Sequence, residues 1–171
     1  IRLADGMPLI WAARLQGTPL PERVAGSEII WALCERAARD RRRVFFLGGN
    51  PGAAAAASQR LVATYSGLIV AGIEVPPLGF ERDQSYLQAL DERLRAADPE
   101  LVLVGLPGQK QDPLIRRLTT VLPRAWFAGI GVTFSFVAGE VKKPPTIVRR
   151  IGLEWFFRLL QEPRRLARRY L

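Results

Sequence analysis

Three polar side chains of this sequence are candidates for chemistry on a phosphorylated substrate: Asp5, Arg23 and Gln111. Asp5 precedes Gly6 in an early loop, and a positioned carboxylate can accept the proton of an attacking hydroxyl. Its other interpretation is a cap on the helix that follows. Because the chain has no histidine, acid–base chemistry falls to carboxylates, and a zinc site or a histidine base is not expected.

Arg23 stands between a proline-containing segment, 18–21, and an expected helix entrance at Gly26. A guanidinium fork can hold a substrate phosphate through two parallel hydrogen bonds. The alternative is a surface ion pair with Glu22 or Glu28. The sequence leaves both interpretations open.

Gln111 follows an apolar run, 101–105, and the glycine-containing turn after it. An amide at a helix start beyond a strand end can orient a sugar or a diphosphate. It can equally cap the helix, and Asp112 beside Pro113 has the character of a capping residue.

Glycine-rich turns recur after the apolar runs, at 48–52, 105–108 and 129–131. Backbone can approach a phosphate closely at glycine, and a following helix N-terminus adds partial positive charge. A tight turn without a ligand explains any one of them, but three at one end of a sheet favour a nucleotide-type site. We expect Gly48, Gly49 and Gly105 to contact the ligand.

Short apolar runs alternate with helical patterns along the chain. Strands are expected near 44–47, 68–72, 101–105 and 125–130, and helices near 8–15, 27–39, 53–65, 84–97 and 111–122. This alternation predicts an α/β fold with a Rossmann-like, mainly parallel sheet flanked by helices on both faces. Ligands of such sheets sit beyond the carboxyl ends of the strands. Asp91 and Glu92 are expected on a solvated helix face.

The positive charge is concentrated at the end of the chain. Nine basic and two acidic residues give 142–171 a net charge of +7, whereas 1–141, with 16 basic and 14 acidic residues, carries +2. We expect two parts: a core, 1–141, and a basic, amphipathic helical C-terminal appendage, 142–171. Arginines beside aromatic side chains suit a phosphate-bearing lipid at a membrane face, although packing on the core or a solvated surface would explain them too.

A single cysteine, Cys34, leaves no internal disulfide and fits a reducing compartment. It lies on an amphipathic helix pattern, which predicts a buried small hydrophobe. No run of about eighteen apolar residues is present, so no span across a bilayer is expected. The chain begins with isoleucine, and we expect an N-terminal portion to be missing.

The order of several motifs resembles the WecG/TagA/CpsF bacterial glycosyltransferases over essentially the whole chain. The resemblance is carried by segments 5–12, 21–27, 44–52, 76–80, 105–112, 131–139 and 152–170. It implies an inverting, metal-independent hexosyltransferase without a cofactor. Such an enzyme moves a sugar, typically N-acetylmannosamine, from UDP onto an undecaprenyl-diphosphate-linked sugar in teichoic acid, common-antigen or exopolysaccharide synthesis.

The same resemblance assigns roles to residues of this chain. Asp5 corresponds to the proposed base, while Arg23 and Gln111 correspond to substrate-binding residues. The appendage is implied to close over the site and bind the lipid diphosphate through Arg149, Arg150, Arg158, Arg164, Arg165, Arg168 and Arg169. Implied partners are a UDP-sugar donor, a polyprenyl-diphosphate-linked acceptor and the cytoplasmic face of the bacterial plasma membrane, with a homo-oligomer left open and no nucleic acid.

The sequence departs from the family pattern at three positions. Ser135 stands where many members have aspartate, Asp112 replaces glutamate, and Ala25 replaces threonine. These departures bear on the donor sugar more than on the reaction class. A UDP-glucuronic acid-type donor for an exopolysaccharide is the alternative.

Two other classes of function compete with a glycosyltransferase. A nucleic-acid-binding module would use the basic tail, but the nearly neutral residues 1–141 argue against it. A non-catalytic module docking on anionic lipid is favoured if Asp5 is a cap and no cleft forms near it.

Overall fold

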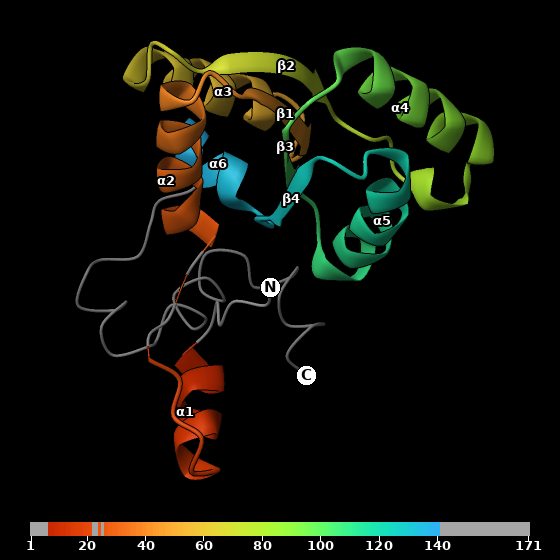
Figure 1. The fold of residues 1–171 in the computed structure, drawn as a ribbon. Helices are drawn as coiled ribbons and strands as arrows, with labels where there is room; N and C mark the ends of the chain where they lie inside the picture. Colours follow the sequence, from red (N-terminus) through yellow and green to blue (C-terminus); the bar gives the residue numbers. More distant parts are fainter. Residues whose placement is uncertain (1–6, 22–23, 25, 141–171) are drawn as a thin grey trace. The chain divides into compact units, whose positions relative to one another are not determined.

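A computed structural model describes residues 7–21, 24 and 26–140 (Figure 1). The chain forms two compact units, one spanning 26–141 and the other composed of 1–25 and 142–171. In the latter, the described helix is α1 (Met7–Leu15), which ends where the sequence predicts. The unit 26–141 contains the sheet and is described by itself.

This unit alternates helices and strands as predicted. Its elements are α2 (Gly26–Arg39), β1 (Arg43–Gly48), α3 (Ala53–Thr64), β2 (Ile69–Glu74), the 3-10 helix η1 (Phe80–Arg82), α4 (Gln84–Ala97), β3 (Leu101–Gly105), α5 (Gly108–Val121), β4 (Trp126–Gly129) and α6 (Thr133–Ala138). The four strands are parallel and lie in the order β2-β1-β3-β4. The predicted Rossmann-like α/β fold is confirmed, with η1 and α6 as additional elements.

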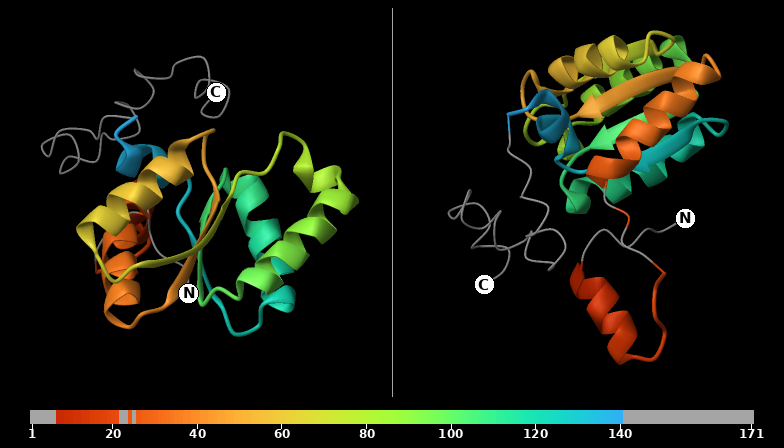
Figure 2. Two further views of the ribbon diagram at one scale, coloured as in Figure 1. Left: turned by 90° about the horizontal axis from the view of Figure 1, so that it is seen from above. Right: turned by 90° about the vertical axis from the view of Figure 1, so that its left-hand side faces the viewer.

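The two central strands are buried on both faces, which explains their continuous apolar sequences. Val44 and Phe46 of β1 pack on one side against α2, α3 and α6. Phe45 and Leu47 pack on the other side against α4 and α5. Figure 2 shows these two helical layers on either side of the sheet. Cys34 of α2 is fully buried in the first layer, as predicted.

The connections give the two ends of the sheet opposite characters. Helices α3, α5 and α6 begin just beyond the carboxyl ends of β1, β3 and β4. Helices α2, α4 and α5 end just before the amino ends of β1, β3 and β4. The carboxyl edge therefore receives helix N-termini with their partial positive charge, and the amino edge receives helix C-termini.

Two expectations for acidic residues are wrong. Asp112 caps nothing, because α5 begins earlier, after Pro107, and places Asp112 inside the helix. Asp91 is buried rather than solvated, since α5 packs over that side of α4 and Arg117 Nη2 lies 2.7 Å from its carboxylate. Glu92 is exposed, as expected.

Candidate functional site

Two glycine turns meet at the carboxyl edge of the sheet. The Gly49 N–H donates to the Gly105 carbonyl at 2.7 Å. Gly48 and Gly49 have φ of +99° and +87°, and a Cβ on Gly48 would lie 2.7 Å from the same carbonyl oxygen. A side chain at Gly48 would thus be excluded by both backbone conformation and space. The structure brings together the three glycines that the sequence singled out.

Phe134 of α6 forms the floor under these turns. It is fully buried, with its ring centroid 5.6 Å from that of Phe46. A Cβ on Gly105 would lie 2.5 Å from the Phe134 ring, and one on Gly49 would lie 3.1 Å from it. The absence of side chains at these glycines allows α6 to pack directly beneath the turn backbone.

Gln111 connects the second glycine turn to the third. Its Oε1 accepts a hydrogen bond from the Gly131 N–H at 3.0 Å. A Cβ on Gly129 would lie only 2.2 Å from the Gln111 Nε2, so the amide lies flat against the glycine backbone. In this structure Gln111 does not cap its own helix. Its amide instead links the start of α5 to the β4–α6 turn.

Asn50 is a site residue that the sequence reasoning did not single out. Its Nδ2 donates to the Ser135 hydroxyl at 3.2 Å, and Ser135 is buried. The Ser135 hydroxyl therefore accepts a hydrogen bond within the fold, and this bond links the first glycine turn to α6. The signal available in the sequence was the place of Asn50 between Gly49 and a Pro-Gly pair.

The edge has the electrostatics of an anion-binding surface. Neither α3 nor α5 has a side-chain cap at its N-terminus or an acidic residue in its first turn. Such N-termini present unpaired N–H groups and a partial positive charge to a ligand. Lys110 in the first turn of α5 lies at the same edge, where it pairs with Glu81 at 2.8 Å and lowers the pKa of that carboxyl. A diphosphate suits this combination.

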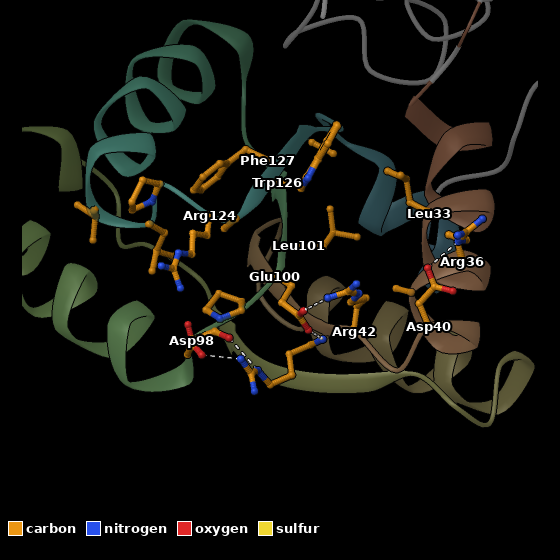
Figure 3. A pocket seen from close by; sticks show the side chains of 18 of the residues that line it. Leu33, Arg36, Asp40, Arg42, Asp98, Glu100, Leu101, Arg124, Trp126 and Phe127 are labelled. Atoms are coloured by element: carbon orange, nitrogen blue, oxygen red, sulfur yellow. Dashed lines mark hydrogen bonds and ion pairs between the residues drawn. The ribbon is translucent and has the colours of Figure 1, made fainter.

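The opposite, amino edge of the sheet carries an open hollow of about 1010 Å³ (Figure 3). Three of its five lining arginines pair with acidic side chains, whereas Arg95 and Arg124 make no ion pair with a described residue. The ion pairs are Arg36–Asp40 at 2.6 Å, Arg43–Asp98 at 2.5 Å and Arg42–Glu100. Because three helices also end here, their partial negative charge disfavours a phosphate. This hollow therefore lies away from the site that the glycine turns indicate.

Several predicted site residues lie outside the described residues: Asp5, Arg23 and the seven arginines of 142–171. Within the described ranges, no group of three or more histidine, cysteine, aspartate or glutamate side chains is placed to hold a metal ion. No helix in this described part has the length and apolar character needed to cross a membrane.

Comparison with known proteins identifies the family. The model of the "Glycosyl transferase WecG/TagA/CpsF family" matches residues 1–171. The chain belongs to the WecG/TagA/CpsF glycosyltransferase family. A similar curated protein is the N-acetylglucosaminyldiphosphoundecaprenol N-acetyl-beta-D-mannosaminyltransferase of Bacillus spizizenii, 31% identical over 166 residues. The match covers 97% of this chain and 62% of that relative, so this WecG/TagA/CpsF chain spans less than two thirds of the relative's length.

Proposed function

We propose that the protein is an inverting glycosyltransferase that moves N-acetylmannosamine from UDP to an undecaprenyl-diphosphate-linked sugar. The observation that carries the proposal is the junction of Gly48, Gly49 and Gly105 between two uncapped helix N-termini, in a member of this family. The printed name of the Bacillus spizizenii relative supports both the sugar and the lipid-linked acceptor.

In this proposal the donor diphosphate lies against the glycine turns. Negative charge develops on the departing UDP as the bond to the sugar breaks, and preorganised N–H donors stabilise that charge. The first turns of α3 and α5 supply such donors in place of a metal ion. Gln111 holds the β4–α6 turn in place beside them, with its Nε2 packed against Gly129.

The proposed base is Asp5. Its carboxylate accepts the proton of the acceptor hydroxyl while that oxygen bonds to the anomeric carbon and UDP leaves from the opposite face, which inverts the configuration. Arg23 binds a substrate phosphate. The acceptor diphosphate is bound by Arg149, Arg150, Arg158, Arg164, Arg165, Arg168 and Arg169, in keeping with the net charge of +7 over 142–171.

A lipid-linked acceptor requires the enzyme to work at a bilayer surface. We therefore place the protein at the cytoplasmic face of the bacterial membrane as a peripheral protein, attracted to anionic lipid by its basic tail. The product enters teichoic acid or another cell-surface polysaccharide.

The deciding experiment offers several UDP-sugars together with a polyprenyl-diphosphate-linked acceptor to the complete natural protein and measures UDP release. UDP-N-acetylmannosamine should support release only when the acceptor is present. Preference for UDP-glucuronic acid would replace the proposed donor, and no release with any pair would contradict the function. Asp5→Asn should abolish transfer while leaving UDP binding intact, and unchanged turnover would remove Asp5 from the mechanism.

A further inference from the structure

Leu78 is fully exposed to solvent in the loop between β2 and η1. The backbone before it is restricted, because the rings of Pro76 and Pro77 fix the φ angles there. After it, Gly79 takes a left-handed conformation with φ +83° and Phe80 is buried. The fold therefore holds this leucine out into solvent on a constrained backbone.

Other apolar side chains accompany Leu78 at the end of β2. Ile73 is 40% exposed and Val75 is 38% exposed, and Pro77 is exposed as well. Single exposed leucines are ordinary on protein surfaces, whereas several apolar side chains in one short, constrained segment indicate a binding surface. We refer to residues 73–78, which are the last two residues of β2 and the loop after it, as the apolar loop.

Two carboxylates in and near the apolar loop, Glu74 and Glu81, pair with cations of the fold, whereas Asp83 caps α4 and keeps its charge. Glu74 accepts a hydrogen bond from the Tyr86 hydroxyl at 2.8 Å and pairs with Arg93 at 3.2 Å. Glu81 pairs with Lys110 at 2.8 Å. These two ion pairs reduce the repulsion that free carboxylates would meet at an anionic bilayer.

The apolar loop lies at the same edge of the sheet as the candidate site. It leaves the carboxyl end of β2, where Glu74 is in register with Leu47, next to Gly48. Downstream, the Lys110 ammonium lies 5.6 Å from the centre of the Phe80 ring and pairs with Glu81. These contacts connect η1 to the first turn of α5, close after Gly105.

We propose that the apolar loop is a membrane contact that inserts Leu78 into the boundary between headgroups and acyl chains. This inference rests on the proposed function, because a lipid-linked acceptor brings the carboxyl edge to a bilayer. A constrained apolar tip with internally paired charges is the chemistry of an interfacial anchor. The occupant is the bilayer itself, not the polyprenyl chain of the acceptor.

The test uses Leu78→Cys carrying an environment-sensitive fluorophore, with Trp126→Cys as the matched control. Trp126 is 72% exposed and lies at the opposite edge of the sheet. The native thiol is a suitable blank, since burial raises the pKa of Cys34 to about 12 and hides it from labelling at neutral pH. With vesicles of phosphatidylglycerol and phosphatidylcholine, the label at 78 should shift to shorter wavelength, while the label at 126 should not.

A second variant measures the contribution of the leucine. Leu78→Asp should weaken partitioning onto these vesicles about tenfold, as expected for one leucine removed from an apolar environment. A label at 78 that stays in water, or that responds only when a polyprenyl phosphate is added, overturns the proposal, as does unchanged partitioning of Leu78→Asp. UDP release separates the two proposals: transfer without insertion refutes only the membrane contact, and insertion without transfer with any sugar refutes only the glycosyltransferase function.

Discussion

The two edges of one sheet are built differently. At the carboxyl edge three of the four strands, β1, β3 and β4, end in glycine, and the amide of Gln111 links the start of α5 to the β4–α6 turn. At the amino edge β1, β3 and β4 begin with Arg43, Leu101 and Trp126, and each of the three lining acids pairs with an arginine. Every β–α connection places the N-terminus of its helix at the carboxyl edge. The partial positive charges that favour an anion therefore lie at that edge and not at the amino edge. The hollow at the amino edge is thus a poor guide to the site.

The largest expected contrast between the edges concerns two aromatic side chains. Phe134→Ala should destabilise the protein by about 3–5 kcal/mol, because a buried ring leaves a cavity under the glycine turns. Trp126→Ala, at an exposed position of the amino edge, should change stability by no more than about 0.5 kcal/mol. Urea unfolding of both variants measures this, and equal losses would contradict the assignment of Phe134 as the floor of the site.

A second comparison, within the carboxyl edge, separates the cost of a steric clash from the cost of a left-handed backbone at a glycine. Gly48→Ala should cost about 2–4 kcal/mol, since it adds a clash with the Gly105 carbonyl to a left-handed backbone. Gly52 is also left-handed, with φ +83°, but has open space around it, so Gly52→Ala should cost only about 1–2 kcal/mol. If denaturant midpoints of the two variants coincide, the close approach of the turns contributes nothing.

The order and type of the main strands and helices could be predicted from the sequence because local patterns carry that information. Apolar runs such as 101–105 and glycine turns directly after them indicate a parallel sheet without any tertiary knowledge. The burial of Asp91 could not be predicted in this way, because it depends on α5 packing over α4 and supplying Arg117. The contacts of Gln111 and Asn50 likewise join residues about 20 and 85 positions apart, which no local pattern reveals.

A substitution at Gln111 removes the hydrogen bond that links the start of α5 to the β4–α6 turn without changing the glycines themselves. Gln111→Ala removes the bond to the Gly131 N–H and should cost about 1 kcal/mol, with weaker UDP binding because the β4–α6 turn loses its support. Gln88→Ala, at an exposed position of α4, is the matched control and should change neither property. Calorimetric titration with UDP and urea unfolding of both variants decide this. Unchanged UDP affinity in Gln111→Ala, or an equal loss in the control, would contradict the role of Gln111.

The smallest expected effect is a pH dependence at both edges. Hydrogen bonds from Arg42 lower the pKa of Glu100 at the amino edge, and those from Lys110 lower the pKa of Glu81 at the carboxyl edge. A carboxyl whose pKa is lower in the folded state contributes stability above its ordinary value of 4.5, and this contribution is lost as the pH falls below that value. Glu100→Gln and Glu81→Gln should each flatten the acid limb of the stability curve slightly, and high salt should remove the difference because both pairs are exposed. Glu81→Gln also leaves Lys110 unpaired near the apolar loop, so this variant alone should partition more strongly onto anionic vesicles. An equal change in Glu100→Gln would mean that the two edges are not electrostatically distinct.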